Sequence, residues 1–310
     1  MSGQAQAARP PGRLPEWLRR SLPAGAGAVR RLIGREGLST VCLHARCPNA
    51  AECFSRGTLT FMILGDRCTR SCRFCAVAAD GPPAPVDPDE PQRVADAAGR
   101  LGLRHVVITS VTRDDLLDGG AGQFANVVRA VRDVLPRATV EILTPDFQGD
   151  PASIDAAVAA GPDVFNHNVE TVPRLYGAVR PQADYRRSLA VLARAGRHRP
   201  GRPLIKSGLM VGMGERPGEI AEILRDLRSA GCDILTIGQY LAPSPEHHPV
   251  ARFVPPEEFE DMAGNHHHRI ILPRLGPVCT VPYFFYPISF HWGSPVWVDC
   301  IREPPSLCQL

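Results

Sequence analysis

Apolar and polar positions alternate along the middle of the chain in a repeating order. Short apolar runs typical of buried strands are each followed by a longer stretch whose apolar residues recur at helical spacing. We predict six strands, at Leu59–Leu64, His105–Val111, Val140–Pro145, Val164–Glu170, Leu204–Val211 and Ile234–Leu241. We predict helices between them, at about Pro91–Leu101, Gln123–Val131, Ile154–Ala160, Tyr185–Ala195 and Gly218–Ala230.

This succession of strand-then-helix units predicts an α/β fold in which crossover helices join parallel strands. Six units match a partial (β/α)6 TIM-like barrel, because a closed barrel of eight units would need two more strands. On pattern alone, a doubly wound open sheet is the alternative. No Gly-x-Gly-x-x-Gly follows the first strand, which argues against a dinucleotide-binding domain.

The two ends of the chain break this order and suggest three parts. Residues 1–56 form an N-terminal extension that contains cysteines, residues 57–263 form the predicted barrel, and residues 264–310 form a divergent tail. The tail contains the run His266–His268, to which we assign no role, and it shows neither a helical nor an alternating period. We expect the tail to be poorly ordered.

Composition narrows the class of protein only moderately. The chain has 310 residues, of which 44% are hydrophobic and 22% charged, as in ordinary globular proteins. The net charge of +3 is too small to argue for nucleic acid or a membrane surface as a partner. No apolar run approaches the roughly 18 residues of a membrane-spanning helix, and the first residues lack the apolar core of a signal peptide. We therefore expect a cytoplasmic protein.

Six of the ten cysteines fall in two triplets. The first has the spacing C-x4-C-x5-C, at Cys42, Cys47 and Cys53, and the second has the spacing C-x3-C-x2-C, at Cys68, Cys72 and Cys75. Clusters at ligand spacing without an export signal favour metal binding over disulfides. Three ligands are informative, because structural zinc sites use four protein ligands, whereas a four-iron cluster held by three thiolates keeps one iron open.

The second triplet follows the first predicted strand, so in a barrel it would lie at the C-terminal edge where active sites form. Its spacing, with Phe74 before the last cysteine, resembles the radical S-adenosylmethionine (SAM) superfamily. That resemblance implies a barrel of radical SAM type and a 4Fe-4S cluster whose open iron binds SAM. A zinc knuckle is the simpler alternative for such a loop, but it would not account for the six strand–helix units behind it.

The first triplet makes the resemblance more specific. Within radical SAM enzymes, C-x4-C-x5-C shortly before the SAM triplet resembles the lipoyl synthase family. The likeness runs from about Leu14 to about Ala263. It includes TSVTRDDLLDGG at 109–120, EILTPDFQG at 141–149, FNHNVETV at 165–172, IKSGLMVGMGE at 205–215 and TIGQYLAPS at 236–244.

The resemblance implies a reaction, cofactors and partners. The family is a group of sulfurtransferases that insert two sulfur atoms, at C6 and C8, into an octanoyl chain on a lysine of a carrier protein. Two SAM molecules are consumed, and an auxiliary 4Fe-4S cluster on the first triplet is sacrificed as the sulfur donor. The implied partners are octanoylated lipoyl-carrier domains, namely 2-oxoacid dehydrogenase E2 subunits and the glycine cleavage H protein, with reduced ferredoxin or flavodoxin as electron donor.

The resemblance also implies residues that contact SAM or substrate, all near the predicted strand ends. Each could instead be an ordinary residue of the barrel interior. Lys206 draws added attention because it is the only lysine in the chain. The candidates are Thr109, Ser110, Asn168, Glu170, Arg180 and Lys206.

The end of the chain departs from the family. Family members carry an Arg-Ser-Ser-Tyr segment whose serine is the fourth ligand of the auxiliary cluster, and the resemblance here stops after FVPPEEFEDMAG at 253–264. The auxiliary cluster is then left with an open iron, or takes Cys279, Cys300 or Cys308 as a ligand. We expect sulfur insertion to be impaired in this form.

Three other functions fit parts of this pattern. Biotin synthase and methylthiotransferases share the SAM triplet, but the extra triplet before it argues against biotin synthase. A non-catalytic iron–sulfur electron carrier would not need six strand–helix units. Cleavage of SAM by the chain would exclude the electron-carrier function.

Overall fold

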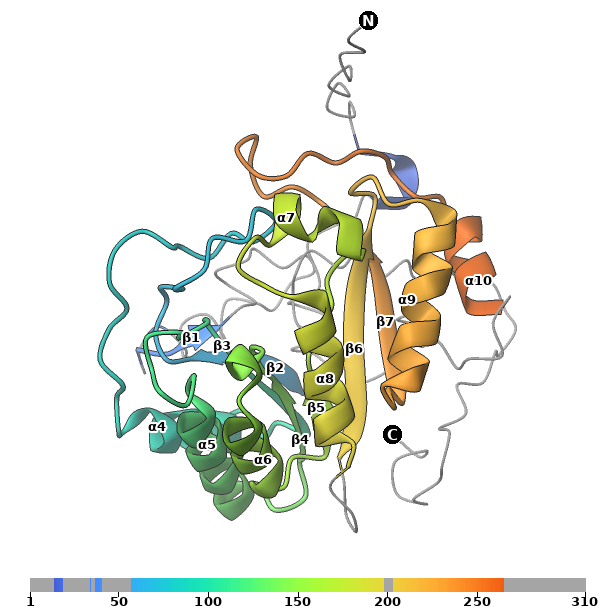
Figure 1. The fold of residues 1–310 in the computed structure, drawn as a ribbon. Helices are drawn as coiled ribbons and strands as arrows, with labels where there is room; N and C mark the ends of the chain where they lie inside the picture. Colours follow the sequence, from blue (N-terminus) through green and yellow to red (C-terminus); the bar gives the residue numbers. More distant parts are fainter. Residues whose placement is uncertain (1–13, 19–33, 35–36, 41–56, 198–202, 265–310) are drawn as a thin grey trace, which may run out of the picture.

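A computed structural model describes residues 14–18, 34, 37–40, 57–197 and 203–264 (Figure 1). Its sheet contains seven strands: β1 (Ser39–Thr40), β2 (Thr58–Ile63), β3 (His105–Ser110), β4 (Thr139–Leu143), β5 (Val164–Asn166), β6 (Leu204–Val211) and β7 (Ile234–Gln239). Strands β2 to β7 are parallel, and β1 pairs antiparallel with β2.

The strands lie side by side in the order of the sequence, β1 to β7. A doubly wound sheet reverses its strand order at a switch point, and no reversal occurs among the described strands. The partial-barrel prediction is therefore confirmed. Figure 1 shows the helices running along one side of the curved sheet, as right-handed crossovers require.

The helices bury apolar faces against the outer side of the sheet. They are α4 (Glu90–Arg100), α5 (Ala121–Val134), α6 (Pro151–Ala159), α8 (Tyr185–Ala195), α9 (Pro217–Ser229) and α10 (Pro256–Gly264), with the four-residue α7 (Tyr176–Val179). Short 3-10 helices occur at η1 (Glu16–Leu18), η2 (Phe147–Gly149) and η3 (Pro173–Leu175). All six residues of β2 are buried, because helices cover one face of the strand and barrel-interior side chains cover the other.

Most predicted elements are present, with small differences at their ends. Strand β5 ends at Asn166, although the sequence pattern extended it to Glu170. Beyond Asn166 only an isolated bridge, from Glu170 to Leu209, continues the ladder, and Glu170 has a left-handed backbone with φ 66°. A strand cannot continue through that conformation, so the chain leaves the sheet at the site described below.

Some predictions fall outside the described residues. These concern the first triplet (Cys42, Cys47, Cys53) and the tail from residue 265, including His266–His268, Cys279, Cys300 and Cys308. None of the described helices has both the length and the apolar character needed to cross a membrane.

Candidate active site

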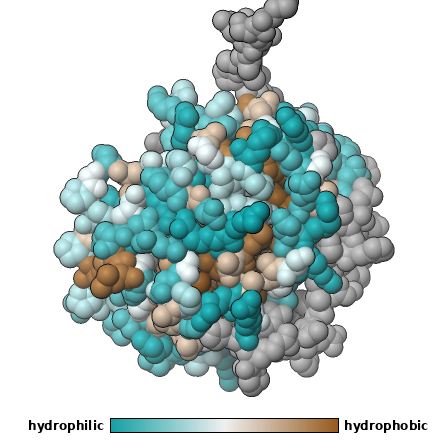
Figure 2. Space-filling view, in the orientation of Figure 1, coloured by the Kyte–Doolittle hydropathy of each residue, from teal (hydrophilic) through white to brown (hydrophobic). Residues whose placement is uncertain are grey.

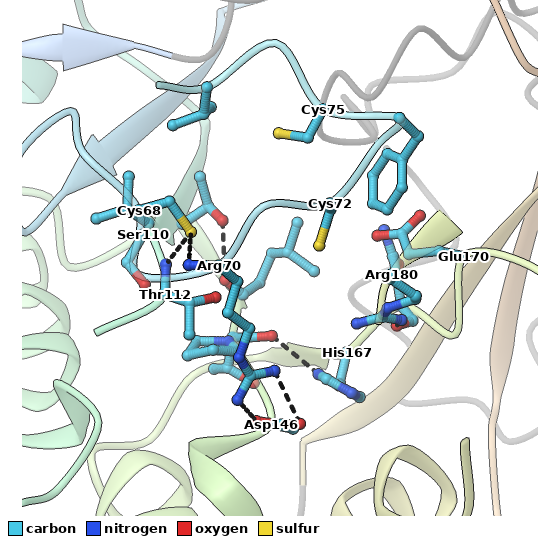
Figure 3. Close-up of a pocket in the computed structure, with 18 residues that line it drawn as sticks. Cys68, Arg70, Cys72, Cys75, Ser110, Thr112, Asp146, His167, Glu170 and Arg180 are labelled. Atoms are coloured by element: carbon cyan, nitrogen blue, oxygen red, sulfur yellow. Dashed lines mark hydrogen bonds and ion pairs between the residues drawn. The ribbon is translucent and has the colours of Figure 1, made fainter. Parts of the chain in front are cut away.

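The second cysteine triplet lies on the loop that leaves the C-terminal end of β2 (Figure 3). Leu64 starts this loop in a left-handed conformation, with φ 65°, and two buried side chains hold its peptide groups. The Glu90 carboxylate accepts the Leu64 N–H at 3.1 Å, and Arg113 donates to the Leu64 carbonyl at 3.3 Å. The turn into the cysteine loop is thus fixed by charged groups from α4 and from the loop after β3.

The three cysteines border a pocket formed by the strand ends. Five of the six predicted SAM or substrate contacts also line it: Thr109, Ser110, Asn168, Glu170 and Arg180. They come from the ends of β3 and β5 and from the segment after α7. Figure 3 shows Cys72, Glu170 and Arg180 on the same side of the pocket.

The cysteine sulfurs are partly sheltered from solvent. The Cys68 thiol accepts backbone N–H groups from Arg70 at 3.4 Å and Thr112 at 3.3 Å. Burial raises the pKa of Cys72 to about 11, and it also raises the pKa of Cys75. Buried thiolates without a counter-charge are unfavourable, so these positions are suited to a cation that binds the sulfur directly.

Glu170 and Asn168 bring unsatisfied acceptors to the pocket. Both side chains are buried, and neither Glu170 Oε2 nor Asn168 Oδ1 has a hydrogen-bond partner among the described residues. Burial raises the pKa of Glu170 to about 7, although the Arg180 charge and a hydrogen bond with Asn168 act to lower it. Buried polar atoms normally have partners, so these oxygens point to a bound group with donors of its own.

Arg180 lies beside these acceptors and is held from two sides. Its Nη1 donates to the carbonyls of Asn168 and Val169, both at 3.1 Å. Its guanidinium lies over the ring of Tyr176, 5.1 Å from the centroid, where a cation–π contact is favourable. Arg180 therefore provides a fixed positive charge at the wall of the pocket.

Lys206, the sixth predicted contact, does not line the pocket. Its side chain is fully buried in the barrel interior, and Nζ lies 2.8 Å from Glu141 Oε1. His105 Nε2 lies 3.4 Å from the other carboxylate oxygen, Glu141 Oε2. The structure thus places Lys206 in an ion pair with Glu141 and not among the residues that line the pocket.

Five further polar or charged residues line the pocket and are not among the predicted contacts: Arg70, Thr112, Thr144, Asp146 and His167. Arg70 lies within the second cysteine triplet, and the other four lie inside blocks that carry the family resemblance. These motifs are the signal that could have identified them. Burial lowers the pKa of His167 to about 4, so its imidazole is neutral. Its Nδ1 lies 2.9 Å from the Thr144 carbonyl and can only donate there, which leaves Nε2 as the acceptor.

Three thiols from one loop are a donor set that fits an iron–sulfur cluster. No group of three or more His, Cys, Asp or Glu side chains in the described part of the chain is placed to hold one ion. A four-iron cluster differs in that each thiolate binds a separate iron, so the sulfurs can stand further apart. Cys68, Cys72 and Cys75, which border one pocket together with unsatisfied acceptors, match that donor set.

Comparison with known proteins supports this chemistry. The model of the Radical SAM superfamily matches residues 62–227. The chain is 57% identical over 259 residues to a lipoyl synthase of Methylococcus capsulatus, covering 82% of this chain and 79% of that protein. It is 54% identical over 257 residues to a lipoyl synthase of Chlorobium chlorochromatii, covering 82% and 87% of the two chains.

Solved structures give a more distant likeness, in the fold alone. Methylornithine synthase (PylB) superposes with a TM-score of 0.51 at 16% identity, covering 74% of this chain and 64% of that one. HydG, a maturase of the FeFe-hydrogenase, superposes with a TM-score of 0.52 at 13% identity, covering 77% and 60%.

Proposed function

Because this chain belongs to the lipoyl synthase family of radical SAM enzymes, we propose that it is a sulfurtransferase that inserts sulfur at C6 and C8 of an octanoyl chain. The octanoyl chain is carried on a lysine of a lipoyl-carrier protein. The observation that carries the proposal is the placement of three thiols, from one loop, around a pocket at the C-terminal strand edge.

Cys68, Cys72 and Cys75 are the proposed ligands of the 4Fe-4S cluster that binds SAM. When bound, the cluster and SAM supply radical chemistry, which saturated C–H bonds require because they offer no acid–base handle. The chain itself holds the sulfurs in place, orients the bound molecule and excludes water from the pocket.

The charges and hydrogen-bonding atoms of the pocket residues determine which groups of a bound molecule each residue can contact. Asn168 and Glu170 offer unsatisfied oxygens to hydroxyl or ammonium donors, and Arg180 offers a positive charge to a carboxylate. The Thr109 hydroxyl already donates to the Leu143 carbonyl at 2.9 Å, so it can only accept from a ligand. Ser110 Oγ has no partner among the described residues and is available for either role.

The remaining parts of the proposal rest on the family and the sequence. Cys42, Cys47 and Cys53 in residues 1–56 hold an auxiliary 4Fe-4S cluster that donates sulfur to the substrate bound by the barrel of residues 57–263. The partners are E2 subunits or the glycine cleavage H protein, and reduced ferredoxin or flavodoxin supplies electrons. Thiols at ligand spacing need a reducing compartment, which favours the cytoplasm.

An anaerobic assay tests the proposal. The reconstituted chain is mixed with SAM, a chemical reductant and an octanoyl-lysyl peptide, and both 5′-deoxyadenosine and the thiolated peptide are measured. We expect 5′-deoxyadenosine together with slow formation of the thiolated peptide, since the sequence predicts impaired sulfur insertion, and we expect neither product from Cys72→Ala. Absence of SAM cleavage in the iron-loaded chain would contradict the proposal, whereas cleavage without sulfur insertion would contradict only its sulfurtransferase part.

A further inference from the structure

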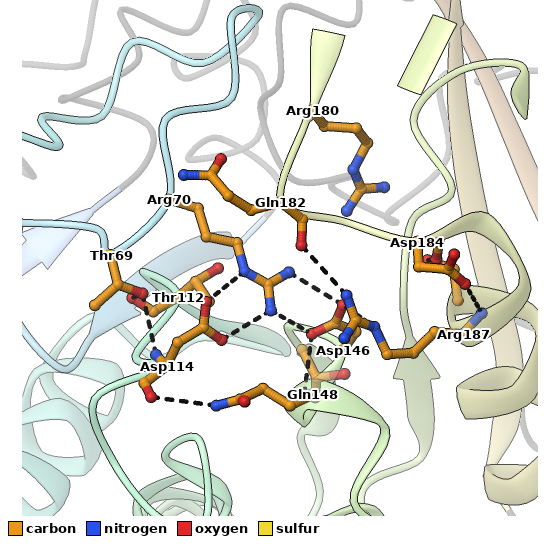
Figure 4. Close-up of polar contacts among 12 residues, drawn as sticks. Thr69, Arg70, Thr112, Asp114, Asp146, Gln148, Arg180, Gln182, Asp184 and Arg187 are labelled. Carbon is orange, nitrogen blue, oxygen red and sulfur yellow. Dashed lines mark hydrogen bonds and ion pairs between the residues drawn. The ribbon is translucent and has the colours of Figure 1, made fainter. Parts of the chain in front are cut away.

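The residues between the cluster cysteines make an unusual set of contacts (Figure 4). Arg70, midway between Cys68 and Cys72, directs its guanidinium toward two carboxylates. Its Nε and Nη2 donate to Asp114 at 2.6 and 2.8 Å, and its Nη1 and Nη2 donate to Asp146 at 3.0 and 2.7 Å. One guanidinium thus makes paired hydrogen bonds with two carboxylates.

The two carboxylates come from different strand–helix loops. Asp114 follows β3, and Asp146 follows β4. The side chains of Arg70 and Asp146 are 5% and 0% exposed, so water cannot replace the contacts between them. A buried pair of this kind is costly to break, because the remaining charge is left without a partner.

A second arginine extends the network toward the next loop. Arg187, on α8, lies with Nε 2.9 Å from Asp146 Oδ2, and its Nη2 donates to the Gln182 carbonyl at 3.2 Å. The Gln182 side-chain oxygen in turn accepts the Ser71 N–H at 3.2 Å. Two arginines and two aspartates therefore balance in charge while they join the cysteine loop to three other loops.

The neighbours of Arg70 reinforce the same connection. The Thr69 hydroxyl donates to the Thr112 carbonyl at 3.0 Å and accepts the Asp114 N–H at 3.0 Å. Thr112 also gives its own N–H to the Cys68 sulfur. Further along the loop, Arg73 donates its N–H to the Val179 carbonyl at 2.7 Å. Thr69, Arg70, Ser71 and Arg73 are thus held by the loops after β3 and β4 and by the segment from α7 to α8.

We propose that Arg70, Asp114, Asp146 and Arg187 form a clamp that presets the shape of the cysteine loop, with Arg70 as its central positioning residue. The clamp holds the loop at the geometry in which the three thiols can receive the cluster. This role rests on the proposed function in one respect, namely that the triplet binds iron; the fixing of the loop itself is a property of the chain.

Hydrogen exchange followed by mass spectrometry, on the full-length chain after chelation and after anaerobic iron loading, tests the clamp. We expect slow exchange of the peptide covering residues 67–76 in both forms of the wild type. In Arg70→Gln that peptide should exchange roughly tenfold faster in the chelated form, which corresponds to about 1.4 kcal/mol. Iron bound per chain at limiting iron should fall as well.

The matched control is Arg194→Gln. Arg194 pairs with Asp155 through two hydrogen bonds, at 2.7 and 2.5 Å, between α8 and α6, away from the cysteines. Its loss should leave the 67–76 peptide and the iron content unchanged. The peptide covering β6 reports global unfolding in each variant. If Arg70→Gln also accelerates exchange of the β6 peptide, the clamp is tested with Asp114→Asn instead. Asp114 is 32% exposed, so its replacement should loosen only the cysteine loop.

The clamp would be overturned if the 67–76 peptide were equally protected from exchange in the wild type and in Arg70→Gln, or in Asp114→Asn where Arg70→Gln unfolds the chain. Rapid exchange of that peptide in the chelated wild type would also overturn it. A protected loop in a chain that binds no iron would instead contradict the proposed function and leave the clamp standing. The two failures are therefore distinguishable.

Discussion

Glu170 combines three features that lower the stability of the folded chain. It is buried, has a left-handed backbone and carries an oxygen without a partner among the described residues. Strain and unsatisfied groups of this kind persist where function requires them. This combination suggests that Glu170 is retained for a ligand and not for the fold.

Glu170→Gln should therefore stabilise the ligand-free chain and weaken SAM binding. At pH 8 the carboxylate is ionised, and its pKa is raised from 4.5 to about 7, so the folded state loses about 3 kcal/mol that the amide would not lose. Urea unfolding should show a higher free energy for the variant. Equilibrium binding should show weaker SAM affinity, and unchanged affinity would remove Glu170 from the proposed contacts.

Lys206 and Glu141 form a fully buried ion pair, in which each charge has a partner. Glu141→Gln should destabilise the chain by about 3–5 kcal/mol, because it leaves the Lys206 ammonium buried without a counter-charge. The double variant Glu141→Gln with Lys206→Met should recover much of that loss. Urea unfolding of the single and double variants measures the coupling, and additive losses would show that the two residues do not interact.

The same pair predicts a pH dependence. Burial acts to raise the pKa of Glu141, but Lys206 and His105 hold it at about 2, below the ordinary 4.5. A lowered carboxylate pKa contributes stability that is complete above about 4.5 and is lost as the pH falls toward 2. The wild type should lose unfolding free energy over that interval, and Glu141→Gln should show a shallower loss.

At the scale of single elements, β6 must pass close behind the site. A Cβ atom added at Gly208 would lie 2.8 Å from both Asn168 Oδ1 and Thr236 Oγ1. Gly208 accepts the Glu170 N–H at 3.0 Å through its carbonyl, so the strand also supports the left-handed turn. Glycine is needed here for space, since its φ is not positive.

Gly208→Ala should therefore disturb the site through Asn168. We expect a loss of about 1–3 kcal/mol in unfolding free energy, the usual range for overpacking, together with weaker SAM binding. Gly218→Ala on α9 is the control, because nothing lies within 4 Å of an added Cβ there. Full SAM affinity in Gly208→Ala would mean that Asn168 can move without affecting the ligand.

How far the sequence predicts these elements depends on local signals. The bounds predicted for α8 and β6 agree with the structure. Helix α8 begins where Asp184 accepts the Arg187 N–H, and Gly196 follows its last residue. Strand β5 was predicted too long, because nothing in the residue pattern indicates the left-handed backbone at Glu170. Strand β1 was missed because two residues carry no period.

The site residues also separate into those with a sequence signal and those that only the fold reveals. Cys68, Cys72 and Cys75 follow from spacing, and Asn168, Glu170 and Arg180 from the family motifs. Arg70 was not selected, because its two partners lie 44 and 76 residues away and only the fold brings them together. The family resemblance predicts Lys206 as a cofactor contact, whereas its ion-pair partner Glu141 could be recognised only from the pairing of β4, β5 and β6.

At the scale of the whole molecule, the sequential strand order determines what can meet at the active edge. Each of the parallel strands β2 to β7 ends at the same edge, so loops distant in sequence converge there. The cysteine loop follows the first parallel strand, while the Tyr240–Arg252 segment follows the last. Two contacts join these segments. His248 donates its N–H to the Arg73 carbonyl at 2.7 Å, and His247 Nε2 lies 3.1 Å from the Cys75 carbonyl.

The final prediction separates the two cysteine triplets by their effect on the whole reaction. With two clusters, the reconstituted wild type should bind about eight irons per chain. Replacing Cys42, Cys47 and Cys53 by alanine should leave about four irons and should retain SAM cleavage while abolishing sulfur insertion. Replacing Cys68, Cys72 and Cys75 should also leave about four irons but abolish SAM cleavage. The two variants thus serve as controls for each other, since both remove three thiols. If both lost SAM cleavage equally, the triplets would not have separate roles, and a wild-type content near four irons would remove the auxiliary cluster.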